Sequence, residues 1–216
     1  MKRYQSGFTL IEIAIVLVII GLLLGGVLKG QELINSAKVK NLASDFKNTS
    51  LFIYSYQDKY HALPGDDALA ASHVTGATTA AAAKRGDGKI DGKWDSTTNT
   101  DESFLFWQHV RLSGIAAGVT DTADTTGYPQ RNTSGGLIGV TNSTDMDITG
   151  TNGKLKGSYI ICSAGIVGKF AKQLDVALDD GNTATGTMMS ISGTTSPATA
   201  VADPDDSTLY TVCQGV

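Results

Sequence analysis

Histidine and cysteine are scarce in this sequence. Three histidines (His61, His73 and His109) and two cysteines occur among 216 residues. No spacing of these residues, or of the carboxylates around them, forms a metal centre or an activated nucleophile. We therefore expect the three histidines to be structural or surface residues, and we expect the chain not to be an enzyme.

Basic residues are also in the minority. The chain has 17 Lys and Arg against 21 Asp and Glu, which gives a formal net charge of −4. A mildly acidic chain lacks the basic face with which proteins bind nucleic acid. No nucleic-acid partner is therefore predicted.

The number of cysteines is even, since the chain has two, Cys162 and Cys213. In an oxidising compartment such a pair suggests one disulfide, whereas two buried free thiols are the alternative. A bridge would close a loop of about 50 residues and contribute roughly 4 kcal/mol in the chain-entropy model. It would tie the last part of the chain back to the preceding domain.

One long apolar run stands out against the polar remainder. It extends over 21 residues from Phe8 to Leu28, and Glu12 is its one ionisable residue. About 20 helical residues cross the hydrocarbon core of a membrane. A charge there costs roughly 2.5–3.5 kcal/mol at the helix centre, so Glu12 is expected to have a partner and a function.

The seven residues before this run are short, polar and basic, and they end in Gly7. A secretory signal peptide has its small-residue cleavage site after the apolar region. Here the small residue comes first. A cut after Gly7 would therefore remove a leader of residues 1–7 and leave the whole membrane helix on the product, starting at Phe8.

The motif G-F-T-L-I-E at residues 7–12, with the apolar run behind it, resembles the N-terminus of type IV prepilins and type II secretion pseudopilins. The resemblance implies that Gly7 ends the leader, that Phe8 is N-methylated and that Glu12 acts in assembly. It also implies a prepilin peptidase, other pilin or pseudopilin subunits, inner-membrane assembly machinery and membrane lipid as partners. The same families commonly close their C-terminal region with a disulfide, which supports the Cys162–Cys213 pair.

The chemistry of Glu12 fits this role independently. A new α-amine at Phe8 of one subunit and the Glu12 carboxylate of its neighbour can neutralise each other where neither charge is stable alone. This pairing would fix the axial register between subunits. By the positive-inside rule, the leader stays in the cytoplasm of a bacterial cell, the chain crosses the inner membrane once and the head lies outside, before the subunit joins a pilus or pseudopilus.

The helical pattern continues beyond the apolar run. Apolar residues recur at helical spacing, so we expect one helix from about residue 9 to residue 60, with a membrane segment at 8–28 and a stem at 29–62. The recurring residues are Leu33, Ala37, Leu42, Phe46, Ile53, Tyr56 and Tyr60. Many relatives carry a proline low in the stem, but this stem has none. Its glycines, at positions 21, 25, 26 and 30, are either weak points or close-packing positions.

Residues 63–216 are expected to form a globular head outside the membrane. Its pattern predicts an α+β fold, with a short antiparallel sheet and one or two further helices. The expected helices cover residues 100–113, capped by Thr100, and 166–178. The expected strands cover residues 136–141, 146–149, 158–161, 187–191 and 209–213.

Calcium is the one cofactor that the head suggests. Asp87 and Asp91 lie in the stretch G-D-G-K-I-D-G, where carboxylates and glycines could form part of a calcium loop. The full EF-hand set is missing, and Asp-Gly pairs are also ordinary turn formers. The acidic loop at residues 203–206 is a weaker candidate, for which solvated loop charge is the default.

The sequence therefore predicts a structural subunit of a type IV pilus or a type II secretion pseudopilus. The prediction depends on the first 28 residues and not on the head. The alternative is a single-pass membrane-anchored binding protein whose head recognises a ligand and which does not form fibres.

Overall fold

The computed structural model describes residues 9–216, and it divides the chain into two units. The first unit ends at Lys38 and the second spans Val39–Val216. Helix α1 (Leu10–Tyr60) contributes to both. The predicted leader at residues 1–7 lies outside the described residues, and the predicted boundaries after residues 28 and 62 remain predictions.

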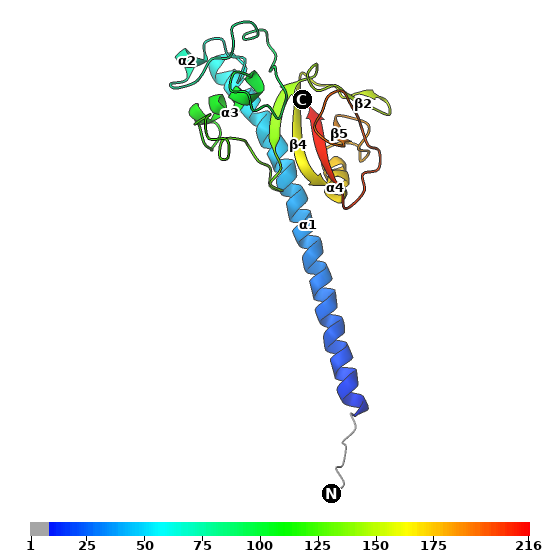
Figure 1. Cartoon of the computed structure of the whole chain (residues 1–216). Helices are drawn as coiled ribbons and strands as arrows, with labels where there is room; N and C mark the ends of the chain where they lie inside the picture. Colours follow the sequence, from blue (N-terminus) through cyan, green and yellow to red (C-terminus); the bar gives the residue numbers. More distant parts are fainter. Residues whose placement is uncertain (1–8) are drawn as a thin grey trace. The chain divides into compact units, whose positions relative to one another are not determined.

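A four-stranded sheet forms the centre of the second unit (Figure 1). Its spatial order is β1-β4-β7-β5, and all three pairings are antiparallel. The strand bounds are Ile138–Asn142 for β1, Tyr159–Val167 for β4, Met188–Ile191 for β5 and Leu209–Gly215 for β7. The predicted α+β fold with an antiparallel sheet is thus confirmed.

The remaining elements are short. A three-stranded sheet has the order β3-β2-β6, in which β6 pairs with β2 in parallel. Its bounds are Ile148–Gly150 for β2, Gly153–Lys154 for β3 and Ala198–Thr199 for β6. The helices are α2 (Ala70–His73), α3 (Glu102–Leu112) and α4 (Gly168–Leu178).

Two apolar clusters cover the two faces of the four-stranded sheet. Because side chains alternate along a strand, neighbours such as Ile160 and Ile161 of β4 belong to different clusters. The larger cluster joins one face to α1, α3 and α4, with Phe46 and Phe106 as fully buried members. The smaller cluster joins the other face to Trp94 and to the three-stranded sheet.

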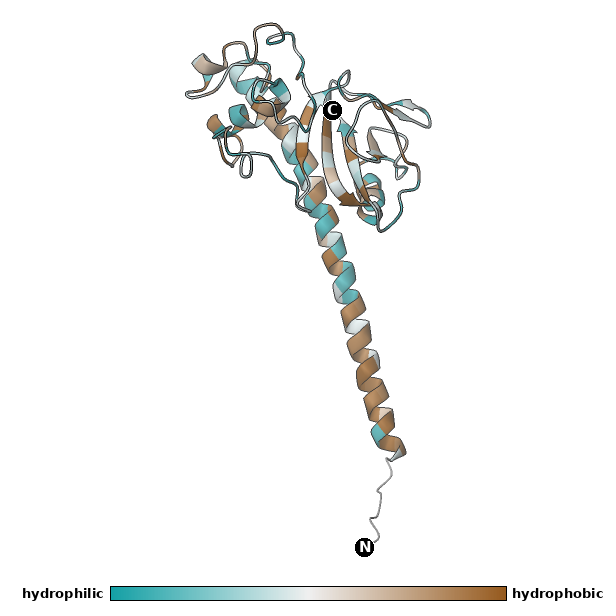
Figure 2. Ribbon diagram, in the orientation of Figure 1, coloured by the Kyte–Doolittle hydropathy of each residue, from teal (hydrophilic) through white to brown (hydrophobic). Residues whose placement is uncertain are grey.

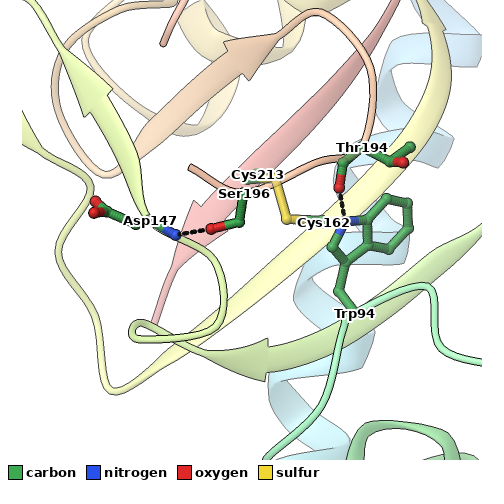
Figure 3. The surroundings of a disulfide bond; sticks show 6 residues. All are labelled: Trp94, Asp147, Cys162, Thr194, Ser196 and Cys213. Carbon is green, nitrogen blue, oxygen red and sulfur yellow. Dashed lines mark hydrogen bonds between the residues drawn. A yellow bond between two sulfur atoms is a disulfide. The ribbon is translucent and has the colours of Figure 1, made fainter. Parts of the chain in front are cut away.

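Cys162 and Cys213 lie in the smaller cluster and form a disulfide. They are directly opposite each other on β4 and β7, with their Cα atoms 4.1 Å apart. Figure 3 shows the bond beside Trp94, whose indole N–H donates to the Thr194 carbonyl oxygen at 3.4 Å. The bridge therefore joins two strands that are already neighbours, under a cover of side chains.

The buried part of α1 begins later along the chain than its apolar pattern. Leu33 is 62% exposed, Ala37 is also exposed, and no described residue up to Lys38 is buried. Burial starts at Val39 and continues through Leu42 and further residues to Tyr56. Helical periodicity predicted the apolar face itself, but it cannot tell which part of a face meets a partner.

Two element boundaries also differ from the prediction. The N-cap of α3 is Asp101 and not Thr100, and its carboxylate accepts the Ser96 hydroxyl at 2.7 Å instead of capping the helix. Ile166 and Val167 end β4 and do not start a helix. A register shift between Ser163 and Ile166 lets the strand continue past the point where its alternation breaks.

His109 illustrates the structural use of histidine in this fold. Its side chain is buried between two backbone segments, where Nδ1 accepts the Gly65 amide at 2.9 Å and Nε2 lies 2.7 Å from the Thr78 carbonyl oxygen. Burial lowers the pKa of His109, so the neutral ring is favoured. The ring thereby holds the segment after α1 against α3.

Candidate functional site

The first unit presents a long apolar surface. Figure 2 shows the N-terminal half of α1 as almost uniformly hydrophobic. The exposed fraction of its large apolar side chains between Leu10 and Leu28 ranges from 46% at Ile20 to 89% at Leu10. Soluble monomers rarely expose so large a continuous apolar surface. This helix is long and apolar enough to cross a membrane.

Glu12 is the acidic residue of the first turn of α1, and it forms a reciprocal cap with Thr9. The Glu12 carboxylate accepts the Thr9 amide at 2.8 Å and the Thr9 hydroxyl at 2.7 Å, while the Glu12 amide lies 3.4 Å from that hydroxyl. This is the capping box of a helix start, in which a threonine and a glutamate three residues later satisfy each other's backbone donors. The positive end of the helix dipole also favours a carboxylate there.

The spacing of Thr9 and Glu12 could have revealed this cap from the sequence. The pattern T-x-x-E before an apolar run is the capping-box signature. The other two predicted processing residues, Gly7 and Phe8, lie outside the described residues. Gly21, Gly25, Gly26 and Gly30 have no neighbouring atom within 4 Å of where a Cβ would stand, so close packing at these positions would require a second helix.

The predicted calcium residues lie in a loop of the second unit. Asp87 is exposed, and its carboxylate accepts the Lys89 amide at 3.0 Å. Asp91 accepts the Asn142 side-chain amide at 2.8 Å and lies 3.4 Å from the Lys84 ammonium. Both residues therefore have protein partners, and calcium binding by them stays a prediction.

Two further carboxylates, which lie outside this loop in the sequence, contact it. Asp66 accepts the backbone amides of Gly86, Asp87 and Gly88. Glu102, at the start of α3, accepts the Asp91 amide at 2.8 Å through Oε2, whereas its buried Oε1 has no hydrogen-bond partner. Only the tertiary fold brings these residues to the loop, since neither follows the spacing of a loop motif.

Burial raises the pKa of Glu102 to about 7, and the charges of Asp66, Asp91 and Asp87 act in the same direction, against the opposing effect of the Asp91 amide. In the unfolded chain the same carboxyl titrates near 4.5. Between these two pH values the folded state binds the additional proton. The stability from this group is thus fully present below about pH 4.5 and is lost as the pH rises through 7.

We predict that Glu102→Gln removes this pH dependence. Relative to the wild type, the free energy of unfolding of the variant should be nearly unchanged at pH 4.5 and should be higher by up to about 3 kcal/mol at pH 8, at 1.36 kcal/mol per pKa unit. Urea unfolding of the full chain in detergent, at several pH values, measures the difference. A constant difference between the two proteins across this range would contradict the prediction.

A comparison with protein-family models matches residues 2–28 to the prokaryotic N-terminal methylation motif. The comparison with curated proteins found no match, and neither did the comparison with solved structures. The matched segment contains Gly7, Phe8 and Glu12, and it ends where the exposed apolar run of α1 ends. Residues 2–28 of this chain therefore carry the prepilin-type signature, which indicates a precursor that a prepilin peptidase processes into a structural subunit.

Proposed function

We propose that this chain is a structural subunit of a type IV pilus or a type II secretion pseudopilus. It is made as a precursor, cleaved after Gly7, N-methylated at Phe8 and assembled by helix packing. The observation that carries the proposal is the coincidence of the methylation motif at residues 2–28 with an exposed apolar helix that has one carboxylate in its first turn.

Helix packing follows from the exposed apolar side chains of the first unit. Its apolar side chains require lipid before assembly, and they require neighbouring helices in a fibre that leaves the membrane. Association of apolar helices depends on close packing, which small residues allow. Gly21, Gly25 and Gly26 provide such positions, because no atom of the described chain occupies the space beside them.

Glu12 sets the axial register between neighbouring subunits of the assembly. Within one chain its carboxylate is already capped by Thr9, so the hydrogen bonds of the helix start are satisfied without a partner. Its negative charge is not neutralised by that cap. The amine that cleavage creates on a neighbouring subunit would supply the missing positive charge in a medium of low dielectric. Subunits would then stack at the offset that brings the two groups together.

The alternative function, a membrane-anchored binding protein, requires a recognition site on the head. Among the residues that the structure describes, aromatic side chains line a pocket of about 240 Å³. Typical small-molecule sites have volumes of about 300–1,000 Å³. This pocket is smaller than that range, but two other pockets of the head, of about 970 and 600 Å³, fall within it, so pocket volume does not separate the two functions. The methylation motif at residues 2–28 is what favours the fibre subunit. The aromatic residues that line the smallest of these pockets are Trp94, Phe104, Trp107 and Tyr128.

Mass spectrometry of two fractions, sheared surface fibres and inner membrane, tests the proposal. The peptide that starts at Phe8 is followed in both fractions, together with its methylation. An abundant N-methylated Phe8 peptide in fibres would support a pilus subunit, and its ratio to other subunits would separate a major from a minor one. The same peptide confined to the membrane would support a pseudopilin or a rare initiating subunit.

The proposal fails if only uncut chain containing residues 1–7 is found in either fraction. The membrane-anchored binding protein would then be the better description. A chain with Gly7 replaced serves as the matched control, because it should show the mass of the uncut N-terminal peptide.

A further inference from the structure

The C-terminal end of α4 brings three carboxylates together. One ligand oxygen from each of Asp175, Asp179 and Asp180 lies within 4.8 Å of the others. Asp175 belongs to the last turn of α4, and the other two residues follow the helix directly. That turn holds no basic residue, and the C-terminal end of a helix carries partial negative charge. The three acids thus stand where negative charge is least favourable.

Asp175 is the observation that points to a ligand. The residue is 0% exposed, and neither oxygen of its carboxylate has a hydrogen-bond partner. Burial raises the pKa of this carboxyl to about 6, and the charges of Asp179 and Asp180 act in the same direction, against the opposing effect of the Gly181 and Asn182 amides. A buried carboxylate without partners is costly unless a cation neutralises it.

The other two carboxylates are held by the loop that follows α4. Asp179 accepts the Thr187 amide at 2.6 Å and the next amide at 2.8 Å, both through Oδ2, which leaves Oδ1 for a ligand. Asp180 accepts the Asn182 amide at 2.9 Å and the Thr185 hydroxyl at 2.7 Å. The positions of both carboxylates are therefore fixed by protein contacts, close to the unpartnered Asp175.

We propose that Asp175, Asp179 and Asp180 bind a divalent cation and that Ca²⁺ is the preferred ion. The set offers only oxygen ligands, which suit a hard cation and not Zn²⁺. Ca²⁺ accepts irregular geometry and completes its shell with backbone carbonyls and water, whereas Mg²⁺ demands a near-ideal octahedron. The site is separate from Asp87 and Asp91, and it does not depend on whether the chain enters a fibre.

A cation at this site would connect the end of α4 with the start of β5, because Asp179 accepts the amides of Met188, the first residue of that strand, and of Thr187 before it. It would bind the folded head and not the unfolded chain. Extracellular calcium modules have dissociation constants on the order of 10⁻⁴–10⁻³ M. At about 5 mM Ca²⁺ the ratio of folded to unfolded chain should then rise about 6- to 50-fold.

The experiment is urea unfolding of the full chain in detergent, first freed of divalent ions by a chelator and then supplied with Ca²⁺ or Mg²⁺ at about 5 mM. We expect Ca²⁺ to raise the urea midpoint of the wild type, and Mg²⁺ to raise it less. Asp175→Asn and the exposed Asp180→Asn should lose the Ca²⁺ shift. Asp203→Asn is the matched control, because that acid is exposed and pairs with Lys172, and it should keep the shift.

The chelated state provides a second readout. Without Ca²⁺, Asp175→Asn should be at least as stable as the wild type, since it removes a buried unpaired charge. With Ca²⁺ this order should reverse. An unchanged wild-type midpoint in Ca²⁺ would overturn the proposal, as would a full shift in Asp175→Asn and Asp180→Asn. A shift that is lost in Asp87→Asn but kept in Asp175→Asn would place the ion in the 86–92 loop and overturn it too.

Discussion

Glu12→Ala should leave membrane insertion at the wild-type level and almost abolish incorporation into fibres. Insertion depends on the apolar run, which the substitution makes more apolar. Incorporation depends on the pairing of Glu12 with the amine of a neighbour. Loss of one partner of a buried ion pair costs about 3–5 kcal/mol, and 1.4 kcal/mol is already tenfold in an equilibrium constant. We expect the ratio of fibre to membrane subunit to fall about 100-fold or more.

Quantitative mass spectrometry of the fibre and membrane fractions measures this ratio. Glu12→Gln is the matched variant, because its side chain can still accept the Thr9 amide and hydroxyl but carries no charge. If Glu12→Gln assembles as poorly as Glu12→Ala, the charge is the essential feature. Wild-type incorporation of the Glu12→Ala chain would exclude the proposed role of this residue in setting the register.

Removal of the disulfide should have the largest effect on the stability of the second unit. Cys162 and Cys213 are separated by 51 residues, and the chain-entropy model gives roughly 4 kcal/mol for a loop of that length. Small domains have total stabilities of about 5–15 kcal/mol, so this is a large share. We expect a chain with both cysteines replaced by alanine to unfold at a much lower urea concentration.

Part of that loss would come from packing, because both cysteines are fully buried in the smaller apolar cluster. Wild-type chain that is unfolded, reduced and refolded in reductant is the control, since it keeps the volume of the two sulfur atoms. It should lose most of the same free energy of unfolding. If reduced and oxidised chains unfold at the same urea concentration, the cross-link does not stabilise this domain.

The sequence predicted those features that depend on local pattern. The apolar run and the helical spacing of Leu42, Phe46 and Ile53 predicted α1, and the short apolar segments around Val140 and Val212 predicted strands of the sheet. Both signals repeat over several residues and need no knowledge of the fold. The motif at residues 7–12 likewise indicated the prepilin-type signature without any tertiary information.

The features that were not predicted depend on long-range contacts. Glu102 meets the 86–92 loop because α3 packs there, and the burial of Asp175 depends on what covers the end of α4. Asp179 and Asp180 follow the predicted helix at 166–178, and the sequence does not show that they meet Asp175 and the start of β5, because the strand contact is tertiary. A local sequence pattern does not show contacts between segments that are far apart in the chain.

The sheet order also constrains the sequence of events by which the head is made. Strand β7 is the last element of the chain, yet it lies between β4 and β5. Those two strands cannot pair through it until residues 209–215 have been synthesised. The sheet therefore closes only after residues 209–215 have been made, and the disulfide, which needs Cys213, cannot form before then. A chain that is released early should remain without a closed sheet and be a substrate for degradation.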